Sequence, residues 1–180
     1  AQLDFHLTPK ENHHLMITGG ILEEMFSGIG FEYLYFENGK NYSVGFEIFD
    51  VKKRDYEMRF GHKDYENITG HINFNYRNYK LIPFDAKVSY GEYLAGDKGT
   101  TLELSRSFSN GMQFGFFASF TDVSKEEFGE GAFDKGIFFN IPIFGNFASY
   151  SWRPLTKDPG QKLIRKNTLH DLLVRFKPIN

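Results

Sequence analysis

The stretch Ile-Thr-Gly-His-Ile-Asn-Phe-Asn-Tyr-Arg, residues 68–77, has the clearest alternation of apolar and polar residues in the chain. Successive side chains of a β-strand point to opposite faces, so Ile68 and Ile72 share one face while His71 and Asn73 share the other. This alternation predicts a strand with one apolar and one polar side. A soluble β-sandwich turns the apolar side of such a strand inward, whereas a membrane β-barrel turns it outward to lipid. This one strand is compatible with both.

The same alternation recurs along the rest of the chain. Residues 28–36 and 42–51 alternate on either side of Asn-Gly-Lys at residues 38–40, which is a strong hairpin signal. The charged stretches 52–66 and 122–131 are predicted to be loops, or strands that project beyond a membrane. In all we expect about ten strands and no long helix, with strands at residues 13–26, 28–36, 42–51, 68–77, 85–94, 100–108, 112–121, 133–144, 147–153 and 169–176.

Length and composition limit the class of protein. The 180 residues suffice for one domain, and we treat residues 1–180 as a single barrel domain. The net charge of -2 excludes binding of nucleic acid through a basic surface field alone. No apolar run reaches the roughly 18 residues that a membrane helix needs, whereas a membrane β-barrel needs no such run. The absence of cysteine excludes disulfides, thiolate metal sites and a cysteine nucleophile.

Polar side chains occupy the second face of nearly every predicted strand. They are Glu32, Glu47, His71, Asn73, Asn75, Arg77, Lys87, Glu103, Gln113 and Asn140. A closed soluble core cannot hold so many polar groups, so this face points either to solvent outside a sandwich or to the lumen of a barrel. Phe, Tyr and Trp make up 18% of the chain, and this aromatic excess favours the lumen. We therefore predict an all-β fold: an antiparallel up-and-down transmembrane β-barrel of about ten strands, either alone or as part of a larger barrel assembly.

Residues with catalytic or metal-binding chemistry form no convincing motif. His13 and His14 are adjacent and so point to opposite faces of a strand, which argues against a shared metal ion. No acidic cluster has the spacing of a calcium loop, and no glycine-rich stretch has that of a phosphate-binding loop. We therefore predict no cofactor, no metal site and no catalytic residue. Glu32, Glu47 and Glu103 leave a membrane-barrel hydrolase open as an alternative, because all three could face one interior.

A series of short motifs runs along the chain in a characteristic order. They read Lys-Arg-Asp-Tyr at 53–56, Phe-Gly-His-Lys-Asp-Tyr at 60–65, Thr-Gly-His at 69–71, Gly-Glu-Tyr-Leu-Ala-Gly-Asp-Lys-Gly at 91–99, Leu-Ser-Arg-Ser-Phe at 104–108, Phe-Gly-Glu-Gly-Ala-Phe-Asp-Lys-Gly-Ile at 128–137 and Trp-Arg-Pro-Leu-Thr-Lys-Asp-Pro-Gly at 152–160. In this order and spacing the chain resembles the C-terminal part of the YjbH family of exopolysaccharide and capsule biosynthesis proteins. The resemblance covers roughly residues 15–165.

The resemblance implies a place in the outer membrane of a Gram-negative bacterium. Members of the family are several times longer than this chain and are expected to be outer-membrane β-barrel lipoproteins. It implies a non-enzymatic barrel that supports secretion or assembly of exopolysaccharide or capsule, with polysaccharide, outer-membrane lipid and other polysaccharide-export proteins as partners. Because the chain starts at Ala1 without Met, we expect a processed chain or a piece of a longer one. From the residues alone, a soluble antiparallel carbohydrate-binding module stays open as an alternative.

Charged residues along these motifs form the candidate site. We expect them to contact polysaccharide or to form an ionic network in the lumen: Arg54, Asp55, Asp64, His71, Arg106, Asp134, Lys135 and Arg153. Of these two roles we favour an ionic network that fixes the shape of the barrel. The glycines expected to serve turns and close strand packing are Gly96, Gly99, Gly129, Gly131 and Gly136.

Overall fold

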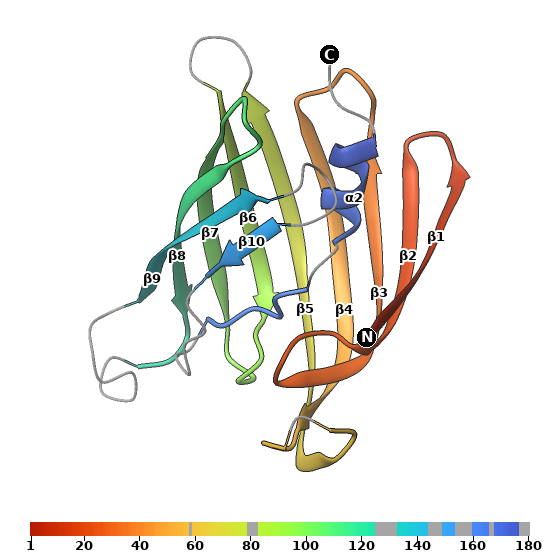
Figure 1. Ribbon diagram of the computed structural model, residues 1–180, viewed down its shortest axis with the longest axis vertical. Helices are drawn as coiled ribbons and strands as arrows, with labels where there is room; N and C mark the ends of the chain where they lie inside the picture. The colour runs from red at the N-terminus through yellow and green to blue at the C-terminus, as the bar shows by residue number, and fades with distance from the viewer. Residues whose placement is uncertain are drawn as a thin grey trace.

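Ten strands form one antiparallel sheet in the computed structural model of the chain (Figure 1). The structure describes residues 1–57, 59–78, 83–124, 133–143, 149–153, 160–165 and 168–176. The strands are β1 (Gln2–Lys10), β2 (His13–Ile21), β3 (Phe26–Phe36), β4 (Tyr42–Arg54), β5 (His62–Asn78), β6 (Phe84–Glu92), β7 (Lys98–Ser107), β8 (Gln113–Thr121), β9 (Asp134–Pro142) and β10 (Ser149–Trp152), and the helix α2 (Leu169–Phe176) follows them. Each strand pairs with its neighbours in the sequence, so the predicted all-β, antiparallel up-and-down order is confirmed.

The sheet is open, and this corrects the expectation of a closed barrel. Its order runs from β1 to β10, and within the described residues no pairing joins these two edge strands. A barrel closes only where its first and last strands pair in register, and here β1 has nine residues while β10 has four. Figure 1 shows a strongly curved sheet with α2 on its concave side. The described part of the chain is thus a curved wall with two edges.

The segment at residues 169–176 is a helix, although we expected a strand there. Thr168 and Asp171 cap it: the Asp171 N–H donates to Thr168 Oγ1 at 3.1 Å, and the Thr168 hydroxyl donates to the Asp171 carboxylate at 2.7 Å. Leu169 and Leu173 are four residues apart and therefore lie on one face of the helix. Capping and helical spacing together outweigh the short apolar run that suggested a strand.

The prediction missed β1 and counted the helical segment 169–176 as a strand. These two errors offset each other, and the number of strands is ten as predicted. Apolar residues occupy every second position of β1, as in the strands that were predicted. The charged stretch 52–66 is also partly strand, because β4 continues to Arg54 and β5 begins at His62. Most of the second charged stretch, 122–131, lies outside the described residues.

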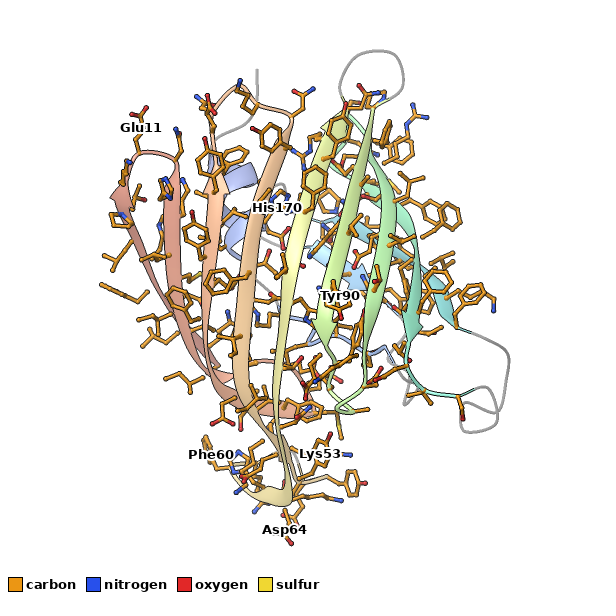
Figure 2. All side chains as sticks on the ribbon, turned by 180° about the vertical axis from the view of Figure 1, so that it is seen from behind. Glu11, Lys53, Phe60, Asp64, Tyr90 and His170 are labelled. Atoms are coloured by element: carbon orange, nitrogen blue, oxygen red, sulfur yellow. The ribbon has the colours of Figure 1, made fainter. Side chains whose placement is uncertain are left out.

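The two faces of the sheet differ sharply in polarity. Large apolar side chains cover the convex face, which Figure 2 shows from outside; among the exposed ones are Leu3, Phe5, Ile17, Ile29, Phe46, Ile48, Ile68, Ile72, Tyr90, Leu102, Leu104, Phe116, Phe120 and Tyr150. Polar side chains are buried on the concave face: His14, Thr18, Glu32, Ser43, Thr69, His71, Asn75, Ser89, Thr101, Ser105 and Ser119. This distribution is the reverse of a soluble sandwich, in which the buried face of the sheet is apolar.

A small apolar core lies between the concave face and the C-terminal strap, which is our name for residues 160–165 and 168–176. One cluster consists of Met16, Leu34, Phe36, Leu169 and Leu173. A second consists of Leu22, Phe26, Phe49, Val51 and Leu94, with Leu163 of the strap packed against it. The strap therefore adds Leu163, Leu169 and Leu173 to the apolar side chains that the concave face already carries. No helix in the described residues is long and apolar enough to cross a membrane.

Neighbouring strands approach each other too closely for a side chain at several glycines. A Cβ atom on Gly91 in β6 would lie 1.9 Å from the Gly70 carbonyl oxygen and 2.7 Å from the His71 Cα atom. Both contacts are with backbone, which cannot move aside as a flexible side chain can. Gly91 therefore allows β5 and β6 to pair at this spacing.

Replacing Gly91 with Ala should lower the free energy of unfolding by about 1–3 kcal/mol, the usual cost of overpacking. Gly19→Ala in β2 is the matched control, because a Cβ atom there would meet its nearest neighbours at 3.9 Å, an ordinary contact. Chemical unfolding of the two variants beside the wild type measures the difference. Equal stability of the two variants would contradict the steric argument.

Candidate functional site

Three carboxylates hold the C-terminal strap on the concave face by accepting hydrogen bonds from its backbone. Asp97, Glu23 and Glu32 accept from the N–H groups of Gly160, Ile164 and Leu169 at 2.7, 2.7 and 3.0 Å. The N–H groups in the first turn of a helix have no partner within the helix, so Glu32 satisfies one that would otherwise be unpaired. Its negative charge also suits the positive end of the dipole of α2.

Arg165 of the strap is buried, with 1% of its side chain exposed. Its guanidinium pairs with Glu32, lies 3.5 Å from Glu47 Oε2 and stacks 4.3 Å from the centre of the Phe49 ring. Glu32 and Glu47 are register partners on β3 and β4, so their carboxylates point into the same region of the concave face. Because two neighbouring carboxylates repel each other, a guanidinium between them stabilises both and ties the strap to the sheet.

Lys162 brings a second strap cation to Glu47. Its ammonium lies 3.5 Å from Glu47 Oε1 and donates a hydrogen bond to Asn73 Oδ1 at 3.2 Å. On the sheet side, the His71 Nδ1 atom lies 3.6 Å from the same Glu47 oxygen. Burial, together with the nearby Lys87 ammonium, lowers the pKa of Lys162 to about 8. Glu47 is thus surrounded by basic groups of both the strap and the sheet.

A cavity of about 260 Å³ lies beside this charge cluster on the concave face. Two ion pairs of the sheet line it: Arg77 with Asp85, and Arg153 with Glu103 at 3.2 Å. The Arg153 guanidinium also lies 4.3 Å from the centre of the Phe117 ring. The cavity walls therefore carry charge of both signs at fixed positions.

Uncharged hydrogen-bonding groups complete the lining of the cavity. The Asn75 amide donates to Ser43 Oγ at 3.1 Å, and the Gln113 amide donates to Ser105 Oγ at 3.1 Å. An amide that makes one such bond keeps further donor and acceptor capacity for a ligand. Amides, hydroxyls and paired charges suit a hydrated, hydroxyl-rich ligand such as a carbohydrate. No group of three or more His, Asp or Glu within the described residues could hold a metal ion.

His170 of α2 belongs to the strap and faces the sheet (Figure 2). Its Nδ1 atom is 3.1 Å from Ser43 Oγ. Burial lowers the pKa of His170 to about 4, so its imidazole is neutral at physiological pH. His170 therefore contributes a hydrogen bond and no charge to the cavity.

The structure places two of the predicted site residues among these groups. Arg153 lines the cavity, and His71 lies beside Glu47. Asp134 is buried on the concave face at the start of β9, where it is the register partner of Ser119.

The remaining charged residues of the predicted site lie elsewhere. Arg54, at the end of β4, donates to the carbonyl oxygens of Glu24 and Arg59 at 2.8 and 2.9 Å, and Asp55 follows it. Asp64, Arg106 and Lys135 are exposed. Arg106 lies 5.3 Å from the centre of the Phe108 ring, and Lys135 lies 4.7 Å from that of Phe133. The structure therefore does not bring the eight charged residues into one network, because the strand pleat sends neighbours such as Asp134 and Lys135 to opposite faces.

The predicted glycines also take different places. Gly96 has a φ of +84° in the turn between β6 and β7, where its N–H donates to the Tyr93 carbonyl oxygen at 3.0 Å. At Gly99 a Cβ atom would lie 2.0 Å from the Phe120 carbonyl oxygen. Gly136 is in β9 opposite Phe117. Gly129 and Gly131 lie outside the described residues.

The sequence reasoning did not identify the strap residues Lys162, Arg165 and His170. The signal for the helix was present in Thr168 and Asp171, which have the spacing of a capping box. No local signal indicates that Lys162 and Arg165 reach back to β3 and β4.

The comparison with known proteins identifies the family. The family model YjbH, described as "Exopolysaccharide biosynthesis protein YbjH", matches residues 1–175. The chain belongs to the YjbH family. Over an alignment of 168 residues it is 40% identical to the lipoprotein YjbH of Escherichia coli (strain K12), and the match covers 87% of this chain and 24% of that protein. The chain thus spans about a quarter of the length of this relative, and no solved structure matches it.

Replacing Arg165 of this YjbH-family chain with Met should lower the free energy of unfolding by about 3 kcal/mol, because the buried Glu32 carboxylate loses its ion pair. Chemical unfolding measures the loss. Arg106→Met is the matched control: Arg106 is exposed, and its replacement should change stability by no more than about 0.5 kcal/mol. A similar loss of stability in both variants would show that the buried ion pair of Arg165 does not cause the loss.

Glu23 should make the docking of the strap depend on pH. Burial raises the pKa of Glu23 from 4.5 to about 7, so between these values the folded chain binds more protons than the unfolded chain. Stability therefore falls as pH rises through this window. Glu23→Gln should remove that part of the fall between pH 5 and pH 8, measured as the free energy of unfolding. Glu11→Gln, at the exposed turn after β1, should keep the wild-type fall; the same fall in all three proteins would refute the assignment.

Proposed function

We propose that this chain forms part of the wall of an outer-membrane β-barrel, and that this barrel supports secretion or assembly of exopolysaccharide or capsule without catalysing a reaction. Membership of the YjbH family supports the link to exopolysaccharide. The convex face of the sheet is the observation that carries the membrane part of the proposal. A lipoprotein among its relatives is consistent with membrane association.

Exposed apolar side chains occur at every second residue along the strands, and they lie on the convex face. On β5 alone they include Ile68, Ile72 and Phe74, and the neighbouring strands β4 and β6 add Phe46 and Tyr90. Soluble monomers rarely expose a continuous apolar surface of this kind. Contact with lipid would remove the cost of hydrating it, as in the outward face of membrane barrels.

Aromatic side chains gather near one end of the strands. Tyr33 and Tyr35 on β3 lie beside His13, and Tyr42 on β4 is the register partner of Tyr76 on β5. Tyrosine has an apolar ring and a polar hydroxyl, so it is enriched where a membrane meets water. This end of the wall has the composition expected at a membrane interface.

The polar concave face supports a hydrated interior. A soluble carbohydrate-binding module would place this polar side outward, and here it is the buried, inward side of the curve. The carboxylates Glu32, Glu47 and Glu103 each pair with an arginine or lysine. Paired carboxylates favour a structural role over the free acid and base of a hydrolase.

The two edges of the sheet support a larger barrel. An exposed edge strand offers unpaired N–H and C=O groups, which cannot stay unpaired inside a membrane. The chain corresponds to about a quarter of its E. coli relative, so other strands of a longer protein could pair with β1 and β10. On this proposal the present strands are one sector of that barrel.

An arginine placed on the convex face tests the membrane proposal. Ile72 lies in the middle of β5 with 62% of its surface exposed. If it faces lipid, Ile72→Arg should cost about 2–4 kcal/mol and deplete folded barrel from the membrane. If it faces water, the change should be almost neutral. The measurement is heat-modifiable gel migration of protein extracted from membranes with detergent.

The control is Tyr56→Arg, because Tyr56 is 72% exposed but lies in the connection after β4. It should leave the folded, heat-modifiable species at the wild-type level. Folded Ile72→Arg protein in normal amount, or wild-type protein that stays in the aqueous phase without detergent, would overturn the barrel proposal.

A further inference from the structure

Among the charges that line the cavity, Lys87 has no ion pair. The cavity cations are Arg77, Lys87, Arg153, Lys162 and Arg165. Four of them have a carboxylate within 4 Å, namely Asp85 for Arg77, Glu103 for Arg153, Glu47 for Lys162 and Glu32 for Arg165. Within the described part of the chain, Lys87 makes neither an ion pair within this distance nor a hydrogen bond. It is the cation that remains available to a ligand.

The sheet aims Lys87 into the cavity. Lys87 lies in the middle of β6, where its register partners are Asn75 on β5 and Glu103 on β7, and all three line the cavity. Glu103 is already held by Arg153 through two hydrogen bonds, of 3.2 and 3.3 Å. A half-buried ammonium is seldom left without an anion or polar partner, because removing it from water costs free energy.

Glu47 and Glu103 lie near enough to Lys87 to feel its charge, but no carboxylate of the described residues lies within 4 Å of its ammonium. Glu47 lies between Lys162 and Arg165 of the strap, and Asp171 is engaged with Thr168 at the start of α2. Among the cations of the described lining, Lys87 alone therefore has no carboxylate within 4 Å, and its ammonium stays accessible to the anionic group of a ligand.

The volume of the cavity and the uncharged amides in its lining limit the class of ligand that can bind. At about 260 Å³ the cavity is just below the roughly 300 Å³ at which pockets for small molecules begin, so it suits one sugar unit of a polymer at a time. The amides of Asn75 and Gln113 can bond to hydroxyl groups beside the charge. One negative charge surrounded by hydroxyls is the chemistry of an acidic sugar.

We propose that this cavity binds a carboxylate-bearing sugar unit of an exopolysaccharide, with the Lys87 ammonium paired to the sugar carboxylate. The inference rests on the proposed function, because it names the chemical class of the polymer. Arg165 and Lys162 hold the strap that closes one side of the site, and the amides orient the ring. The site selects acidic over neutral sugars through a single ion pair.

Two oligosaccharides that differ only in charge test this selection in the wild-type protein. Tetragalacturonate and its methyl-esterified form share rings and linkages, but the ester carries no charge. The full-length protein in detergent should bind the acid about tenfold more tightly than the ester, by calorimetry or equilibrium dialysis. Equal affinity of the two, or no binding of either, would overturn the proposal.

Variants of Lys87 then locate the ion pair. Lys87→Met should weaken binding of the acid about tenfold and leave the ester unchanged, whereas Lys87→Arg should retain the preference. Lys98→Met is the matched control, because Lys98 is exposed and pairs with Glu92 at 3.6 Å outside the cavity. Equal loss in Lys87→Met and Lys98→Met would refute the site. Displacement of the acid by an equal concentration of inorganic phosphate would indicate a general anion site and overturn the assignment to sugar.

The outcome is distinguishable from failure of the proposed function. Detergent dependence and heat-modifiable migration report the barrel whether or not an acidic sugar binds. A membrane barrel that binds acid and ester equally would keep the proposed function and reject the present inference. A water-soluble protein that binds the acid through Lys87 would reject the proposed membrane function and keep the acidic-sugar site.

Discussion

The buried guanidinium of Arg165 is the contact on which the concave side of this sheet depends. β3 and β4 bring Glu32 and Glu47 side by side, and two carboxylates at that spacing repel each other in a poorly hydrated site. Arg165 pairs with both, and the same Glu32 receives the Leu169 N–H at the start of α2. One residue of the strap thus balances the charge of the sheet and sets the position of the helix. The apolar contacts of Leu169 and Leu173 follow from that position.

Alternation along the strands explains why the sheet needs such a strap. Most strands send apolar side chains to the convex face and place many polar ones on the concave face, so burial of the concave face must satisfy hydrogen bonds. Part of this is done within the sheet, where Tyr93, Thr101 and Ser119 form a chain of hydroxyls at 2.6 and 2.8 Å. The strap does the rest through Lys162 and Arg165. The apolar convex face has no comparable partner within the described residues.

The strands could be predicted from the sequence because their signal is local, whereas the site depends on contacts distant in the sequence. Period-two alternation located nine strands and the polar face that contains Glu47 and Glu103. The same alternation places Arg106 with Leu102 and Leu104 on the apolar face. Its position in the strand was therefore already evidence against a place in a lumen network. By contrast, the pairing of Arg165 with Glu32 joins opposite ends of the chain, and no pattern in a single sequence encodes it. Closure of the barrel could not be predicted either, because the alternation of side chains is the same in an open and a closed sheet.

On the proposed function, the paired charges of the concave face would bind a hydrated polysaccharide only weakly. A cation held by its own carboxylate attracts a passing ligand weakly, since its field is largely neutralised at short range. A surface lined mainly by such pairs stays hydrated and binds a polar ligand weakly. On the further inference, Lys87, which has no carboxylate within 4 Å in the described lining, would add one point of preference for an acidic sugar. Lys162 and Arg165 of the strap both lie within 4 Å of Glu47, whereas the Lys87 ammonium does not.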